Sequence, residues 1–190
     1  MSAVVAREPL KTASQMQGLR YELLASGIDI PHFHASEDEQ RVRDRVFPLI
    51  ASMSSISTHT LWVDKRRAAP ALWNQARMYS LFGGAIAKYV LKTLPTADFE
   101  QVVLIFDKAL PAKQENAFLA QVKPALSRLG RPYRIYFHSV KHDFNGQIAD
   151  YLAWSRYVAL ERKEMRPLDS LPQRLRSEFN LFRNGERKYY

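Results

Sequence analysis

The strongest constraint on the fold of this chain is the apolar run VVLIF at 102–106, which lies within FEQVVLIFD at 99–107. A continuous apolar run of this length, rich in β-branched residues, is typical of a strand that is buried on both faces. Such a strand needs a covering layer on each side. Longer helical patterns alternate with short β-rich runs along the chain, so the sequence predicts an α/β protein whose sheet is flanked by helices.

The other elements are predicted from periodicity and from Pro or Gly at their ends. Further strands are expected at 56–63 and 133–140, where polar and apolar residues alternate, and a short apolar run, SAVVA, lies at 2–6. Ser36 and Glu39 are expected to form a capping box at a helix start. The expected helices cover 9–27, 36–50, 71–93, 113–129, 144–164 and a last segment from Pro172 to about Arg183.

Composition sets the broad class of the protein. The chain has 190 residues with 46% hydrophobic residues, which suits a single domain over 1–190 with a substantial core. It contains no Cys, which excludes disulfides and thiolate metal sites and makes a reducing cytoplasm the simplest location. No apolar stretch is long enough for a membrane span, and the first residues lack the apolar run of a signal peptide.

The charge balance points to acidic partners. Lys and Arg number 28 against 19 Asp and Glu, which gives a net charge of +9 and a pI near 9.9. Such a balance favours polyanions, and nucleic acid above all. The alternative is an ordinary solvated surface, on which basic residues are also common.

A carboxylate stands out on the expected helix 144–164. Gln147, Asp150 and Trp154 are spaced by three and four residues and therefore share one stripe of that helix, next to an apolar stripe. A buried unpaired carboxylate is costly, so Asp150 is expected to be paired, bound to a metal or placed at the edge of a site. One alternative is an ion pair with an arginine such as Arg134.

Asp107 supplies a second candidate carboxylate, because it ends the predicted central strand. Sites in open α/β sheets form at the carboxyl ends of strands. Together with Asp150 it could bind Mg²⁺ or Mn²⁺ and support phosphodiester cleavage, which such metals promote through hard oxygen ligands. The alternative is an ordinary strand-to-turn Asp beside Lys108.

Two further clusters contain residue types that bind metals or phosphates. His32 and His34 alternate on an extended link and share a face, which suits a metal or phosphate contact, although their spacing is not that of a zinc site. Asp38, nearby, is expected to be structural. Asp64 and Lys65 follow the strand at 56–63, where a phosphate-facing cluster and a solvated turn are both open readings.

These motifs resemble a family of prokaryotic and phage proteins that is known as a domain of unknown function with a ribonuclease-H-like fold. The resemblance is carried by FH at 33–34, IFD at 105–107 and GQIADYLAW at 146–154, with Glu161 and RP at 166–167. It extends over nearly the whole chain from about residue 30. The Gln-x-Ala-Asp-Tyr motif followed by Trp is fairly specific, whereas IFD alone is not.

The resemblance implies a metal-dependent nuclease, or a related phosphoryl-transfer protein, that acts on nucleic acid. It implies that Asp107 and Asp150 bind Mg²⁺ or Mn²⁺ and that His34 assists them. A second hypothesis is a non-catalytic nucleic-acid- or partner-binding protein of the same fold, and a third is a phosphohydrolase of small nucleotides. The residues expected to contact the substrate are Gln147, Lys65 and Lys108.

One departure from the family concerns its first strand. Family members usually open with a strand that carries Asp-Glu-Ser, and its Asp lies among the metal ligands. This chain begins MSAVVARE, which resembles the strand that follows. The expectation is therefore a ribonuclease-H-like mixed sheet without the first strand, either because the reading frame starts late or because the strand and its ligand are lost.

Overall fold

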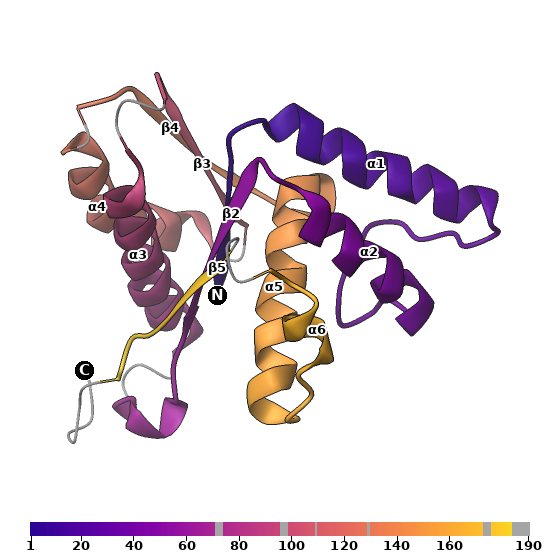
Figure 1. The fold of residues 1–190 in the computed structure, drawn as a ribbon. Helices are drawn as coiled ribbons and strands as arrows, with labels where there is room; N and C mark the ends of the chain where they lie inside the picture. Colours follow the sequence, from indigo (N-terminus) through magenta and orange to yellow (C-terminus); the bar gives the residue numbers. More distant parts are fainter. Residues whose placement is uncertain (71–73, 96–98, 109, 129, 173–175, 184–190) are drawn as a thin grey trace. The chain divides into compact units, whose positions relative to one another are not determined.

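The structure is a computed structural model that describes residues 1–70, 74–95, 99–108, 110–128, 130–172 and 176–183 (Figure 1). The chain is a mixed α/β protein. It divides into two compact units. The first, here the α5 unit, comprises Ser2–Thr60 and His138–Ser177, and the second, here the α3–α4 unit, comprises Met1, Leu61–Phe137 and the chain from Glu178 onward.

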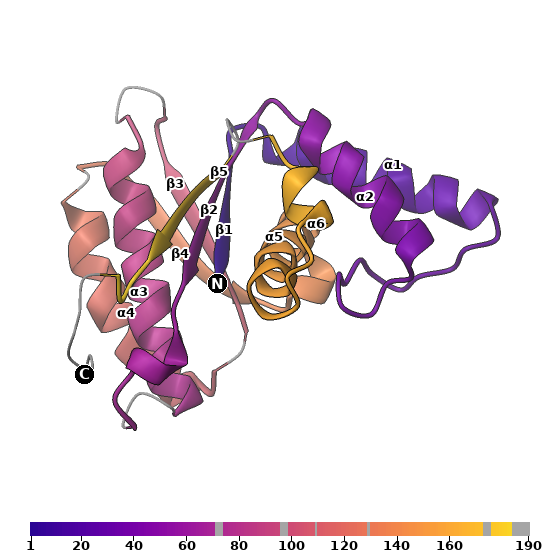
Figure 2. The same ribbon diagram turned by 60° about the horizontal axis from the view of Figure 1, so that its bottom comes forward.

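The α5 unit is built around helix α5, which contacts strand β1 and helices α1 and α6. Its helices are α1 (Pro9–Ala25), α2 (Gln40–Ser52), α5 (Phe144–Glu161) and α6 (Arg166–Asp169). Figures 1 and 2 both show α1 and α2 beside each other, in agreement with their contacts. The expected helix 9–27 is confirmed, with Pro9 at its first position.

The core of the α5 unit is formed where these helices meet. It joins Met16 and Leu23 of α1 and Ile50 of α2 to Ile148 and Tyr151 of α5, and all five side chains are at most 1% exposed. The spacing of Met16 and Leu23 by seven residues, two helical turns, places them on one face of α1. Apolar periodicity therefore predicts most of each buried face, although Leu10 and Leu24, which share the apolar pattern of α1, are 83% and 40% exposed.

The start of α2 differs from the expected capping box. The helix begins at Gln40. Glu39 is its N-cap, but its side chain makes no capping hydrogen bond. Ser36 lies before the helix, where its Oγ is 3.1 Å from His34 Nδ1. The box is wrong because residues 31–38 are held in a loop by other contacts, which are described below.

A three-stranded sheet has the order β1-β2-β5. Strand β1 (Ser2–Ala6) pairs antiparallel with β2 (Ile56–Trp62), with Ser2 opposite Thr60. Strand β5 (Arg176–Asn180) contradicts the predicted helix from Pro172, of which 173–175 lie outside the described residues. The polar RSEFN segment lies against β2, where Ser177 Oγ is 2.7 Å from His59 Nδ1.

The α3–α4 unit packs two adjacent helices on a two-stranded sheet. Its main elements are α3 (Gln75–Thr93), β3 (Val102–Asp107), α4 (Ala112–Ser127) and β4 (Tyr133–His138). Figure 2 shows α3 and α4 side by side, as their contacts require. The expected helix positions 71–73 and 129 lie outside the described residues.

Strand β3 differs from its prediction in burial. Val103 is 53% exposed and Ile105 is 47% exposed, whereas Val102, Leu104 and Phe106 pack on the core of α3 and α4. The prediction of burial on both faces is therefore wrong for this strand. The predicted alternation in β4 is confirmed, because Ile135 and Phe137 face the same core.

Candidate anion-binding site

A loop between α1 and α2, Pro31–Asp38, is held by hydrogen bonds from its backbone to side chains of α5. The amide of Phe33 donates to Gln147 Oε1 at 3.1 Å, and the amide of Ala35 donates to Asp150 Oδ2 at 3.0 Å. Both loop side chains, Phe33 and Ala35, are fully buried. A buried amide needs an acceptor, and this loop receives its acceptors from a helix far away in the sequence.

Asp38 closes the loop from its other end. Its Oδ2 accepts hydrogen bonds from the His34 amide, at 2.9 Å, and from the Tyr151 hydroxyl. Burial raises the pKa of the Asp38 carboxyl and is the main cause of the raised pKa of Tyr151, which its hydrogen bond to Asp38 raises further. The expected structural role of Asp38 is consistent with these contacts.

Arg43 of α2 adds a cationic contact to the same loop. It donates from Nη1 to the carbonyl oxygens of Ala35, at 3.0 Å, and of Asp38. Its guanidinium lies 5.0 Å from the ring centroid of Trp154, within cation–π range. One stripe of α5 therefore holds the Pro31–Asp38 loop and the arginine that packs on it. The residues of this stripe are Gln147, Asp150, Tyr151 and Trp154.

Asp150 is paired with backbone and histidine rather than with an arginine. Besides its bond from Ala35, its Oδ2 lies 3.8 Å from His34 Nδ1, and both side chains are 28% exposed. The structure thus brings together three of the predicted site residues, His34, Gln147 and Asp150, within the α5 unit. Their roles in chemistry stay predictions.

The remaining predicted site residues belong to the α3–α4 unit. Asp107 is the exposed last residue of β3, and its backbone oxygen accepts a hydrogen bond from the Tyr79 hydroxyl at 2.7 Å. Burial and the Asp107 carboxylate both raise the pKa of Tyr79. Lys108 is exposed in the bend that follows, and Lys65 begins a short 3₁₀ helix, although its side chain lies outside the described residues.

Asp64 supports the reading of a solvated turn. Arg66 donates to its carboxylate from Nη2 at 2.7 Å and from Nε at 2.9 Å. These bonds, with one from the Arg66 amide, lower the pKa of Asp64 to about 2. The carboxylate is thus already occupied by an adjacent cation.

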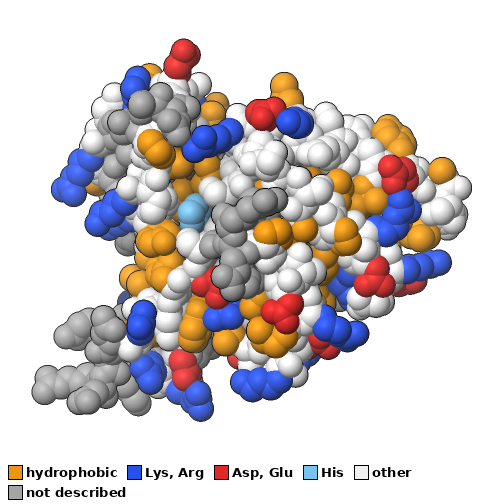
Figure 3. All heavy atoms as spheres, in the orientation of Figure 1, with side chains coloured by type: hydrophobic (Ala, Val, Ile, Leu, Met, Phe, Trp, Pro, Cys, Tyr) orange, Lys and Arg blue, Asp and Glu red, His pale blue; other side chains and the backbone are white. Residues whose placement is uncertain are grey.

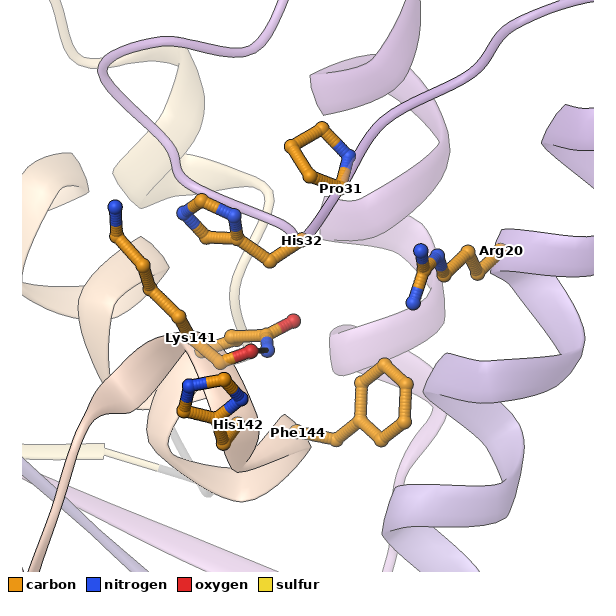
Figure 4. A pocket seen from close by; sticks show the side chains of 7 residues that line it. Arg20, Pro31, His32, Lys141, His142 and Phe144 are labelled. Atoms are coloured by element: carbon orange, nitrogen blue, oxygen red, sulfur yellow. Dashed lines mark hydrogen bonds between the residues drawn. The ribbon is translucent and has the colours of Figure 1, made fainter.

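A hollow of about 520 Å³ opens in the α5 unit beside the Pro31–Asp38 loop (Figure 4). Arg20 enters from α1 and points toward the space next to His32 and Phe144, while Lys141 lies at the edge. Gln147 forms part of the wall and donates from Nε2 to the carbonyl oxygens of Lys141, at 3.1 Å, and of Val140, at 3.3 Å. The lining residues are Arg20, Pro31, His32, Lys141, His142, Phe144 and Gln147.

The chemistry of this hollow, here the basic pocket, suits an anion. Four of its lining side chains are Arg, Lys or His, and none of the described residues that line it is Asp or Glu. Arg20 Nε and His32 Nε2 are buried and have no hydrogen-bond partner within the described part of the chain. Buried nitrogen atoms of this kind are normally paired. The Arg20 guanidinium and the His32 imidazole are groups that bind acceptor oxygens such as those of an anion.

Sequence reasoning missed most of the basic pocket. The sequence predicts a phosphate contact for His32 but not for Arg20, Lys141 or His142. Arg20 lies on α1, and no local pattern connects it with residues 141–142. The one usable signal was Gln147, which links the loop and the segment before α5.

The fit of a divalent cation to the predicted ligands is poor. Among the residues whose placement is described, no group of three or more His, Asp or Glu side chains could hold a metal. His34 and Asp150 alone supply two ligands, whereas Mg²⁺ takes six, mostly oxygen.

No described helix is long and apolar enough to cross a membrane.

Comparison with known proteins identifies no family. Neither a family model, nor a curated protein, nor a solved structure matches this chain.

Proposed function

We propose that this protein binds nucleic acid through its phosphate groups and that the basic pocket is one point of contact. The observation that carries the proposal is that Arg20, His32, Lys141 and His142 all line one hollow, and that none of its described lining residues is Asp or Glu. The net charge of +9 supports it. On the face drawn in Figure 3, Lys and Arg side chains are interspersed with Asp and Glu, so the pocket rather than a basic surface patch carries the proposal.

Salt dependence tests this proposal directly. We expect a fluorescently labelled single strand to bind with an affinity that falls steeply as salt rises, because each neutralised phosphate releases counterions. Arg20→Gln should reduce the slope of log affinity against log salt by about 0.7. Arg41→Gln is the matched control, because Arg41 is exposed on α2 and paired with Glu39. Binding that is absent, or independent of salt, contradicts the proposal.

As a second proposal, the protein cleaves nucleic acid with the help of a metal ion. The ribonuclease-H-like fold is part of this second proposal. It is favoured by the partly exposed His34 and Asp150 side chains, 3.8 Å apart. The Ala35 amide occupies Asp150 Oδ2, and a carboxylate can accept on both of its oxygens. Phosphate oxygens of the bound strand would have to supply further ligands, as is common for Mg²⁺. The pairing of Asp107 with Asp150 and the cytoplasmic location stay predictions.

Asp150→Asn separates a chemical role from a structural one. Asn keeps an acceptor for the Ala35 amide but removes the negative charge that a cation needs. We expect cleavage of DNA or RNA with Mg²⁺ or Mn²⁺ to fall at least tenfold in Asp150→Asn and in Asp107→Ala. Asp169→Asn, which alters an exposed residue of α6, should have no effect. Equal cleavage by the wild type and both site variants would contradict the assignment, whereas no cleavage by the wild type would contradict the nuclease proposal.

A further inference from the structure

We infer that the basic pocket takes a phosphate monoester attached to a nucleoside, rather than an internal phosphodiester of a strand. Two sources share this chemistry, the phosphorylated end of a strand and a free mononucleotide. The inference rests on the proposed function for the choice of a nucleotide as the group that carries the phosphate. The phosphate itself is argued from the pocket alone.

Charge is the first argument for a monoester. Arg20 and Lys141 are cationic side chains, and His32 and His142 add two imidazoles, whereas none of the described lining residues is Asp or Glu. An internal diester carries one negative charge, whereas a monoester carries between one and two near neutral pH. The more highly charged group therefore matches this lining better.

Hydrogen-bond donors are the second argument. Arg20 Nε can only donate, and His32 Nε2 donates in the tautomer that carries its proton there; both atoms are buried without a partner among the described residues. A terminal phosphate offers three unesterified oxygens, which donors on opposite walls of a pocket can reach together. An internal diester offers two, and its ester oxygens are weak acceptors. Donors from α1 and from the Pro31–Asp38 loop thus match a terminal group.

Size and shape are the third argument. The volume of about 520 Å³ lies within the range of small-molecule sites, roughly 300–1,000 Å³. Phe144 lines one wall, with its ring centroid 6.5 Å from that of Phe33. An aromatic ring beside a phosphate site can stack on a base. The pocket therefore has separate surfaces for the phosphate and for the base.

Gln147 is a positioning residue in this account. Its side-chain amide joins the backbone amide of Phe33, next to His32, to the carbonyls of Val140 and Lys141. The cations are thus placed before a ligand arrives, which lowers the entropic cost of binding. In Gln147→Glu an oxygen would face those two carbonyls. This variant should therefore lower the affinity of the pocket for every ligand, even though Arg20 and Lys141 remain.

The test compares affinities for four probes by calorimetry or anisotropy. They are a short single strand with a 5′-phosphate, the same strand with a 3′-phosphate, the strand with both ends unphosphorylated, and a nucleoside 5′-monophosphate. We expect at least one phosphorylated strand to bind tenfold or more tightly than the unphosphorylated strand, and the mononucleotide to compete with it. Arg20→Gln should abolish this preference, Arg20→Lys should retain part of it, and Arg41→Gln should leave it intact.

The outcomes separate this inference from the proposed function. Salt-dependent binding of all strands with no preference for a phosphorylated end overturns the inference and leaves the proposed function standing. Binding of the mononucleotide that Arg20→Gln abolishes, without binding of any strand, supports the pocket and overturns the proposed function. A preference that survives in a folded Arg20→Gln variant, as judged by an unchanged circular dichroism spectrum, also overturns the inference.

Discussion

The two units stabilise their central features in different ways. In the α5 unit, the Pro31–Asp38 loop is held by directed hydrogen bonds from Gln147, Asp150 and Tyr151. In the α3–α4 unit, the corresponding feature is a cluster of rings around Phe118, which is fully buried. One unit thus contains polar side chains that position a backbone, and the other contains apolar side chains that exclude water.

The difference bears on how Asp150 is interpreted. The sequence predicts that this carboxylate is paired, bound to a metal or placed at the edge of a site, and in the structure it accepts a hydrogen bond from the Ala35 amide, while the metal role stays a prediction. Fixing a loop by hydrogen bonds is sensitive to single atoms, whereas ring packing responds to volume. The predictions below use that distinction.

The largest effect is expected from Phe118→Ala. Phe118 lies 4.7 Å from Phe106, 5.7 Å from Tyr79 and 6.0 Å from Phe137, measured between ring centroids. Its removal leaves a cavity among rings and should lower the free energy of unfolding by about 3–5 kcal/mol. Urea unfolding followed by circular dichroism measures this. Val103→Ala, on the exposed side of β3, should cost no more than about 0.5 kcal/mol.

Gly83→Ala tests the same packing by adding an atom. A Cβ at Gly83 would lie 2.7 Å from Phe118 Cε2, and the buried ring has little room to move. We expect a loss of about 1–3 kcal/mol from overpacking. Gly18→Ala is the matched control, because a Cβ there meets nothing within 4 Å and should stabilise α1 by up to about 1 kcal/mol. Equal effects at the two glycines would contradict this packing.

Tyr151→Phe tests the hydrogen-bonded loop by removing one oxygen atom. The change keeps the ring but leaves the buried Asp38 carboxylate without one of its donors. We expect a loss of about 1–3 kcal/mol in unfolding free energy. Tyr157→Phe, at a position 52% exposed, should change it by less than about 0.5 kcal/mol. A loss of similar size in both variants would mean that the hydroxyl of Tyr151 is not special.

The smallest effect is expected from the protonation of His59. Burial lowers the pKa of this imidazole below its ordinary value of 6.5, and its Nδ1 lies 2.7 Å from Ser177 Oγ. The unfolded chain therefore binds the proton more readily. Stability should fall as the pH drops through 6.5 and level off below the folded-state pKa. This portion of the pH dependence should vanish in His59→Asn and persist in His138→Asn, which alters an exposed histidine.

Local patterns predicted helices α1 to α5 and most strands, but neither α6 nor what covers these elements. The run VVLIF specified a strand, and a run of apolar residues cannot state whether a second layer reaches its outer face. The outer face of this strand carries Val103 and Ile105, and the run alone could not predict that they are exposed. The helix predicted from Pro172 is wrong because strand β5 forms by pairing with β2, which is distant in the sequence.

The site was predictable only in part for the same physical reason. The stripe on α5 that contains Gln147 and Asp150 follows from helical spacing, and a carboxylate there does need a partner. Its partner is the Ala35 amide, and backbone amides leave no trace in a sequence. Arg20 could not be linked to Lys141, because the pocket exists only once α1, the loop and the start of α5 have packed together.

Hydrogen exchange at the Ala35 amide tests the central claim, that α5 side chains hold the Pro31–Asp38 loop in place. The wild type and Asp150→Asn should both protect this amide, whereas Asp150→Ala should reduce its protection about tenfold, because loss of an acceptor costs about 1–3 kcal/mol. Amides of α3 and α4 should exchange equally in all three proteins. Unchanged protection of Ala35 in Asp150→Ala would contradict the account.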